Sequence, residues 1–195
     1  MGLTSSSPAA GRKSHHAIVL GVPGAGRKTL ARALLNGAPL KPAQPCVPGM
    51  EVLTGQRACD TWHSGKMMRV TTWSVGGSDR MKPLWPRWAE GATHVVFAVD
   101  AAGGEERTAL ARAELTGLGV MQWAASLPLV VVATKCDVDA PGALDAGGVA
   151  DALCRDGVPW PGAGGAAGAR AWTCVPCSAT AGTGVGSVLQ AVAGS

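Results

Sequence analysis

The chain has 195 residues, which suits one domain with a full hydrophobic core, and 47% of them are hydrophobic, which argues against wholesale disorder. Its net charge is only +4 and its lysines and arginines are scattered, so no basic face interleaved with aromatics indicates nucleic acid as a partner. No apolar run reaches the length of about 18 residues that a membrane-spanning helix needs.

The hydrophobic pattern predicts strands and helices in alternation. A strand over Ala17–Leu20 leads to a helix over Arg27–Leu35, in which Leu30 and Leu34 share one face. The pattern then predicts a loop over residues 38–49, a strand pair over Met50–Ala58 and Lys66–Val75 joined near residues 63–65, a strand over Thr93–Asp100, a helix over Glu105–Val120, a strand over Leu127–Thr134, a loop over residues 157–170, a strand over Ala171–Cys177 and a helix over Gly184–Val192. This alternation predicts a doubly wound α/β sheet with ligands at the carboxyl ends of the strands.

A glycine-rich turn joins the first strand to the first helix, and it has the outline of the phosphate-binding loop G-x-x-x-x-G-K-[S/T]. Glycines allow backbone N–H groups to surround an anion, and the following helix directs the positive end of its dipole at it. Arg27 takes the place of the Lys in this pattern, and Lys28 takes the place of the hydroxyl that binds Mg²⁺. We therefore expect a nucleoside-phosphate site with altered ion chemistry, formed by Gly21, Gly24, Ala25, Gly26, Arg27, Lys28 and Thr29.

Two further motifs follow predicted strands. Residues Thr134–Asp137, Thr-Lys-Cys-Asp, match the guanine-reading pattern [N/T]-K-x-D. The carboxylate of Asp137 would accept hydrogen bonds from the ring N–H and the exocyclic amine of guanine, a pair of donors that adenine lacks. Lys135 would lay its stem along the base. Ser178 and Ala179 resemble the companion loop, in which a backbone N–H contacts the guanine carbonyl.

The chain has six cysteines, and its N-terminal sequence lacks the apolar stretch of a secretory signal peptide. We expect a reducing compartment and free thiols. Cys174 and Cys177 form a C-x-x-C pair. Zinc would need a second pair or spaced histidines, and a redox motif would open a helix instead of following a strand. We interpret this pair as buried thiols at the end of a strand.

A longer segment connects these motifs to one family. Residues 72–85, Thr-Trp-Ser-Val-Gly-Gly-Ser-Asp-Arg-Met-Lys-Pro-Leu-Trp, resemble the W-D-V-G-G-Q-x-x-x-R-P-L-W switch segment of Arf and Arf-like small GTPases. With the phosphate loop and the guanine motifs, the resemblance covers about residues 15–192. It implies a Ras-like P-loop α/β fold, with a mostly parallel six-stranded sheet and helices on both faces. It also implies GTP and GDP as ligands and nucleotide-dependent recruitment of effector proteins at membranes.

The departures from the family pattern concentrate around the metal and the hydrolytic water. The resemblance places Arg27 at the Lys that bridges the β- and γ-phosphates, and Lys28 and Ser74 at positions that hold Mg²⁺ directly or through water. Ser78 takes the place of the catalytic Gln that positions the attacking water, so we expect impaired hydrolysis. Gly77, the backbone contact to the γ-phosphate, is retained.

The first switch also lacks the threonine that completes the family's metal site, because Pro45–Met50 reads Pro-Cys-Val-Pro-Gly-Met. Joint loss of several metal-linked positions makes Mg²⁺ doubtful as a cofactor. One hypothesis is that the ammonium of Lys28, beside Arg27, stands in for the metal. The alternative is that Lys28 points into solvent and that nucleotide affinity is low.

The N-terminus fits M-G-x-x-x-[S/T], the pattern for myristoylation of Gly2. Residues 1–14 are predicted to form a flexible arm ahead of the domain at 15–195. One acyl chain gives only weak membrane association, so we expect a cytoplasmic protein that is peripheral on intracellular membranes if Gly2 is acylated.

The aromatic effector patch of the family maps to Met50, Trp73 and Trp88, although each tryptophan could equally belong to the core. The sequence does not identify the effector, the exchange factor or the activating protein.

Three functions stay open at this stage. The first is a guanine-nucleotide-binding Arf-like switch in vesicle trafficking or signalling, with slow or absent GTP hydrolysis. The second is a nucleotide-poor pseudo-GTPase that acts as a protein interaction module. The third, a P-loop ATPase or kinase, is disfavoured by Asp137, which an adenine would leave unpaired.

Overall fold

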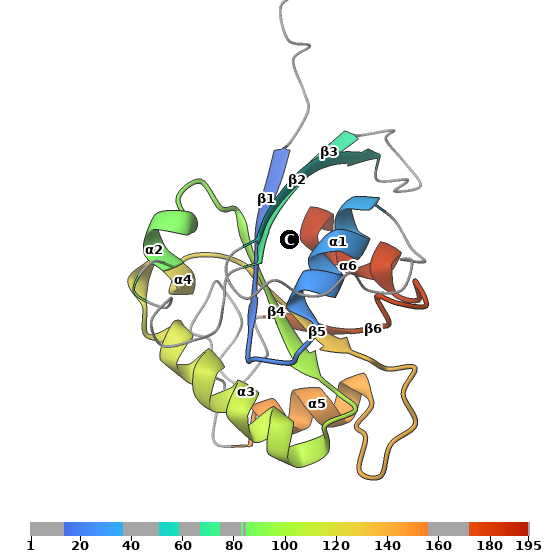
Figure 1. Cartoon of the computed structure of the whole chain (residues 1–195). Coiled ribbons are helices and arrows are strands. Elements are labelled where there is room, and N and C mark those ends of the chain that lie inside the picture. Colours follow the sequence, from blue (N-terminus) through green and yellow to red (C-terminus); the bar gives the residue numbers. More distant parts are fainter. Residues whose placement is uncertain are drawn as a thin grey trace, which may run out of the picture.

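The computed structural model describes residues 14–36, 51–58, 67–74, 83, 85–155 and 172–194. The six strands of this part of the chain form one sheet with strand order β2-β3-β1-β4-β5-β6 (Figure 1). The strands are β1 (Ser14–Gly21), β2 (Glu51–Ala58), β3 (Met67–Ser74), β4 (His94–Asp100), β5 (Leu129–Thr134) and β6 (Trp172–Cys177). The helices are α1 (Arg27–Asn36), α2 (Trp85–Trp88), α3 (Gly104–Gly119), α4 (Gln122–Ala125), α5 (Ala146–Leu153) and α6 (Val185–Gly194).

The strand directions place the predicted motifs at one edge of the sheet. Only β2 and β3 pair antiparallel; β1 runs parallel to both β3 and β4, and β4, β5 and β6 follow in parallel. The loops that leave β1, β4, β5 and β6 therefore begin at the same edge. The predicted α/β fold with a parallel sheet is confirmed.

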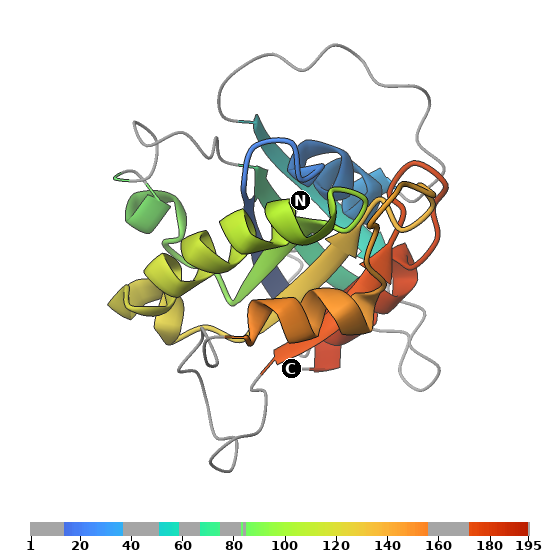
Figure 2. The ribbon, with the colours of Figure 1, turned by 90° about the horizontal axis from the view of Figure 1, so that it is seen from below.

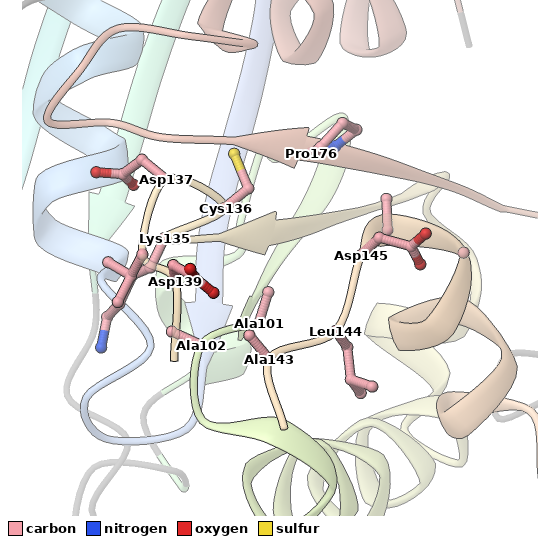
Figure 3. Close-up of a pocket in the computed structure, with 13 residues that line it drawn as sticks. Ala101, Ala102, Lys135, Cys136, Asp137, Asp139, Ala143, Leu144, Asp145 and Pro176 are labelled. Atoms are coloured by element: carbon pink, nitrogen blue, oxygen red, sulfur yellow. The ribbon is translucent and has the colours of Figure 1, made fainter. Parts of the chain in front are cut away.

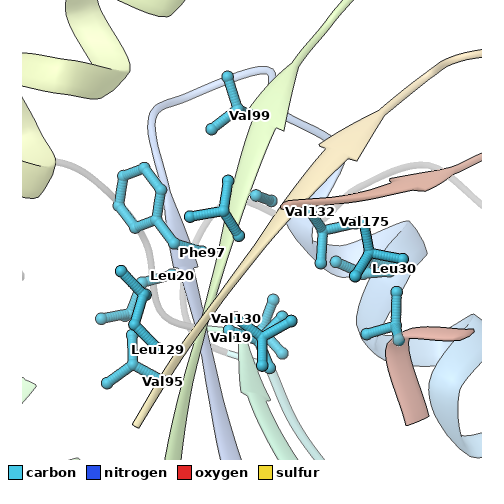
Figure 4. Packing of buried hydrophobic residues seen from close by; sticks show 14 of the residues in the cluster. Val19, Leu20, Leu30, Val95, Phe97, Val99, Leu129, Val130, Val132 and Val175 are labelled. Atoms are coloured by element: carbon cyan, nitrogen blue, oxygen red, sulfur yellow. The ribbon is translucent and has the colours of Figure 1, made fainter. Parts of the chain in front are cut away.

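Helices cover both faces of this sheet. Helices α1 and α6 pack against each other on one face, and α3 and α5 lie side by side on the other (Figures 1 and 2). Successive side chains of the central strands point to opposite faces of the sheet, so they pack alternately against the two helix layers. Phe97 and Leu20 point to one side of the sheet, whereas Val132 and Val175 point to the other side, where Leu30 of α1 lies (Figure 4). All five of these side chains are buried.

Two strand boundaries differ from the sequence prediction. Strand β1 begins at Ser14 and not at Ala17, because its backbone pairs with β3 from Ser14 opposite Arg69, so the predicted arm at 1–14 ends one residue early. Strand β5 begins at Leu129 and not at Leu127. Pro128 has no N–H to donate to a ladder, although its carbonyl accepts a hydrogen bond from Val95.

The sequence prediction also missed three helices. Helices α2 and α4 are single turns of four residues each. Helix α5 has eight residues and contains Gly147 and Gly148, which are poor helix formers. Asp145 caps it by accepting a hydrogen bond from the Gly148 N–H at 2.7 Å.

Other predictions fall outside the described residues. They are the loops over 38–49 and 157–170, the turn near 63–65 and the arm up to residue 13. Within the described parts of the chain, no helix has the length and apolar character needed to cross a bilayer.

Candidate functional site

The turn between β1 and α1 is shaped by glycines and leads directly into a helix. Gly24 and Gly26 have φ angles of +84° and +75°, which side chains rarely adopt, so the turn depends on glycine at both positions. Helix α1 begins at Arg27, directly after Gly26, and buries Leu30 and Leu34. Arg27 is thus the first residue of the helix that follows the glycine-rich turn, and its role at the position of the phosphate-binding lysine stays a prediction.

Arg27 and Lys28 bring two cations to the start of α1, and both side chains are half-buried. Burial lowers the pKa of the Arg27 guanidinium, and the carboxylate of Glu114 on α3 raises it in partial compensation. Arg27 thus lies within the electrostatic reach of an acidic residue on the opposite face of the sheet. This acidic neighbour was not anticipated from the sequence.

Thr134 ties the phosphate loop to the guanine motif. Its buried hydroxyl, at the end of β5, lies 2.9 Å from the carbonyl oxygen of Ala25 and 2.9 Å from that of Val99. A hydroxyl has one hydrogen, which is therefore shared between the two carbonyls. One side chain consequently links the phosphate loop, β4 and the start of the guanine motif.

Lys135 is held by an acidic residue that the sequence prediction missed. Its Nζ lies 2.6 Å from Oδ2 of Asp100, which ends β4 and has a side chain only 9% exposed. Lys135 is also the one non-glycine residue of the described chain with a positive φ, +59°. The ion pair fixes the ammonium and leaves the stem as the part that could cover a base. The signal in the sequence was the acidic residue at the end of a buried strand.

Asp137 has an exposed side chain and makes no ion pair among the described residues. Next to it lies a cavity of about 550 Å³, lined in part by Cys136, Asp139 and Asp145 and reaching Pro176 of β6. Lys135 and Asp137 project to one side of their loop, whereas Asp145 lies on the separate segment that leads into α5 (Figure 3). The carboxylate of Asp137 is thus free to accept hydrogen bonds from a ligand.

The loop after β6 is closed by its own hydrogen bonds. The Ser178 N–H donates to the Thr183 carbonyl at 2.9 Å, and the Ser178 hydroxyl accepts from the Ala181 N–H at 3.1 Å. Ala179 is 8% exposed, and its N–H has no acceptor among the described residues. This N–H is therefore not used among the described residues, and its contact with a guanine carbonyl stays a prediction.

The cysteine pair fits the interpretation as structural thiols. Cys177 is buried and Cys174 half-buried on β6, and neither is part of a disulfide. Burial raises the pKa of Cys177 to about 11, with Cys136 and Asp137 contributing in the same direction. The Cys177 thiol consequently stays protonated and unreactive near neutral pH.

Several predicted residues are not described in full. Gly2, Met50, Gly77 and Ser78 lie outside the described residues. The backbones of Ser74, Trp73 and Trp88 are described, but not their side chains. Ser74 ends β3 opposite Val19, which places its backbone two residues from the phosphate loop along the neighbouring strand.

Comparison with known proteins agrees with this arrangement. The model of the ADP-ribosylation factor family matches residues 4–195. ADP-ribosylation factor-like protein 14 of Mus musculus is 26% identical over 188 residues, covering 94% of this chain and 84% of that protein. ADP-ribosylation factor J of Dictyostelium discoideum is 26% identical over 175 residues, covering 90% of this chain and 81% of that protein. The chain therefore belongs to the ADP-ribosylation factor (Arf) family of small GTPases.

Proposed function

We propose that this protein is a guanine-nucleotide-binding Arf-like switch that hydrolyses GTP slowly or not at all. The observation that carries the proposal is the Thr134 hydroxyl, shared between the carbonyls of Ala25 and Val99. It holds the phosphate loop beside the guanine motif, so a single nucleotide could engage both.

Base selection is assigned to Asp137 and Ala179. The carboxylate of Asp137 would accept from two guanine donors, and the N–H of Ala179 would donate to the guanine carbonyl. Adenine carries an amine in place of that carbonyl and would leave both protein groups unpaired, which is costly in a closed site. This argues against the ATPase or kinase alternative.

The phosphate end favours anion binding over metal binding. Arg27 and Lys28 place two positive charges at the helix start, where the dipole also favours an anion. The same charges repel a divalent cation, and no hydroxyl occupies the Lys28 position to coordinate one. Mg²⁺ therefore fits this site poorly, and hydrolysis that depends on it should be slow.

Nucleotide content tests the proposal. Purified protein is denatured by heat, and the supernatant is analysed by anion-exchange chromatography. An Arf protein that retains the family's metal-binding residues and catalytic Gln is handled in parallel. We expect about equimolar GDP or GTP, and single-turnover hydrolysis of GTP well below that of the reference protein. Bound adenine nucleotide, or rapid Mg²⁺-stimulated hydrolysis, would contradict the proposal. Ser78→Gln should restore little activity, because the metal positions are still substituted.

A nucleotide-poor interaction module is the second candidate, and the surroundings of Arg27 favour it. The Arg27 guanidinium is half-buried and interacts electrostatically with the carboxylate of Glu114. This carboxylate would compete with a phosphate group for the positive charge of Arg27. The same chromatography separates the two candidates. Protein that carries no nucleotide and fails to take up added GDP would favour the module.

The EDTA response is the prediction that concerns the metal. If the ammonium of Lys28 replaces the metal, removing Mg²⁺ with EDTA should change GTP affinity less than about threefold, whereas ordinary family members lose affinity steeply. Lys28→Thr should weaken binding in EDTA and regain some Mg²⁺ sensitivity. Arg32→Thr, which removes a charge further along the same helix, is the control. A collapse of wild-type affinity on chelation would mean that Lys28 does not replace the metal.

Partners and location are part of the proposal. Effector binding is assigned to Met50, Trp73 and Trp88, the positions to which the resemblance maps the aromatic patch of the family, and acylation of Gly2 would give weak, reversible attachment to intracellular membranes. Metabolic labelling with a myristate analogue in cells tests the acylation. Gly2→Ala serves as its negative control.

A further inference from the structure

Asp100 lies beside the start of the guanine motif, although it belongs to no motif itself. It is the last residue of β4, and it pairs in register with Thr134 at the end of β5. Its Oδ2 accepts a hydrogen bond from Nζ of Lys135 at 2.6 Å. A carboxylate from the neighbouring strand therefore holds the residue that follows Thr134.

The two partners of this ion pair differ in burial. The side chain of Asp100 is 9% exposed, whereas that of Lys135 is 40% exposed. Oδ1 of Asp100 is also buried and has no hydrogen-bond partner among the described residues. The Lys135 ammonium is thus the group of the described chain that compensates this buried charge, and a buried carboxylate without such a partner is costly. Asp100 therefore holds the ammonium firmly at the end of β4.

The backbone of Lys135 needs such a restraint. Its φ of +59° lies in the left-handed region, which is unfavourable for a residue with a side chain unless its surroundings hold it there. The Lys135 carbonyl accepts a hydrogen bond from the Val138 N–H at 3.0 Å. This bond closes a turn whose central residues are Cys136 and Asp137. The conformation of Lys135 consequently sets the direction in which Asp137 leaves the sheet.

The ion pair also fixes the stem of Lys135 next to Asp137. Both side chains project to the same side of their loop (Figure 3). With its ammonium held at Asp100, the stem has few rotamers left to lose when a base is bound. A side chain that is ordered before binding lowers the free-energy cost of binding.

We propose that Asp100 is a positioning residue for the guanine nucleotide. Through Lys135 it holds the stem that would cover the base and the turn that presents Asp137. The inference rests on the proposed guanine-nucleotide binding and adds a residue that no motif in the sequence indicates. Asp100 does not touch the nucleotide in this role, so its effect on binding should depend on the presence of Lys135.

A double-mutant cycle tests the inference, with the affinity and the dissociation rate of a fluorescent GDP as readouts. Asp100→Asn keeps the shape of the side chain and removes its charge. It should weaken GDP binding about tenfold, mainly through faster dissociation. Lys135→Met keeps an apolar stem without the ammonium. In that background Asp100→Asn should weaken GDP binding less than about twofold, because the group through which Asp100 acts is gone.

Two further measurements complete the design. Glu106→Gln removes one negative charge from an exposed position of α3, and it should leave GDP affinity unchanged. The reactivity of the Lys135 amine with an acylating reagent is measured by mass spectrometry on protein without added nucleotide. Asp100→Asn should raise this reactivity several-fold, because the carboxylate no longer holds the ammonium. An unchanged reactivity would show that Asp100 does not restrain Lys135.

The outcomes separate this inference from the proposed function. A wild-type chain that takes up no GDP overturns both. If the wild type binds GDP and Asp100→Asn binds it equally well, only the inference is wrong. Weakening by the same factor with Lys135 and with Met at position 135 also overturns the inference, since Asp100 would then support the fold independently of Lys135.

Discussion

Asp137→Asn is expected to lower GDP affinity about 100-fold and to make the xanthine nucleotide XDP the preferred ligand. The carboxylate would accept two charge-assisted hydrogen bonds from guanine, each worth about 1.5–3 kcal/mol. An amide presents one oxygen and one NH₂ group, so it loses one acceptor and places a donor against the guanine amine. Xanthine carries a carbonyl at that position, which the amide NH₂ can meet.

Competition of GDP, XDP and ADP against a fluorescent nucleotide measures this switch. Asp139→Asn is a matched control, because Asp139 is an exposed carboxylate of the same loop and lines the same cavity. It should leave the preference for guanine unchanged. Guanine preference that survives in Asp137→Asn would remove Asp137 from the site, and an equal change in the control would indicate an effect of net charge alone.

Gly184→Ala is expected to lower the free energy of unfolding by about 3 kcal/mol or more and to abolish nucleotide binding. Gly184 has a φ of +77°, and an added Cβ would lie only 2.0 Å from the carbonyl oxygen of Pro176. The clash is with backbone at the end of β6, so no side-chain rotation relieves it. Strand β6 leads directly into Ser178 and Ala179, and the strain would therefore reach the guanine loop.

Urea denaturation measures the destabilisation, and Gly186→Ala provides the control. Gly186 lies in α6, two residues further on, and a Cβ there meets nothing within 4 Å. Alanine favours a helix over glycine by up to about 1 kcal/mol, so the control should be as stable as the wild type or slightly more stable. Equal unfolding midpoints for the two variants would contradict the packing described at Gly184.

Local patterns predicted most of the fold because the central strands are long, continuous apolar runs. His94–Asp100 and Leu129–Thr134 are buried throughout, and such runs are typical of parallel strands covered on both faces. Helix α5 was missed because its residues favour a helix only weakly. It is stabilised by tertiary packing, since Val149 and Leu153 are fully buried, and by the cap at Asp145. A short stretch of sequence reveals neither the packing partners of this helix nor the hydrogen bond of its cap.

For the candidate site, the sequence by itself predicted the parts that successive residues form. The phosphate loop and the guanine motif are each read by a few successive residues, because a turn and the end of a strand are shaped locally. Only the tertiary structure placed Asp100 at Lys135 and Glu114 within reach of Arg27. The partners in each pair lie 35 and 87 residues apart, and the sheet and its helix layers bring them together. No local pattern records such pairs, since they depend on the packing of the whole domain.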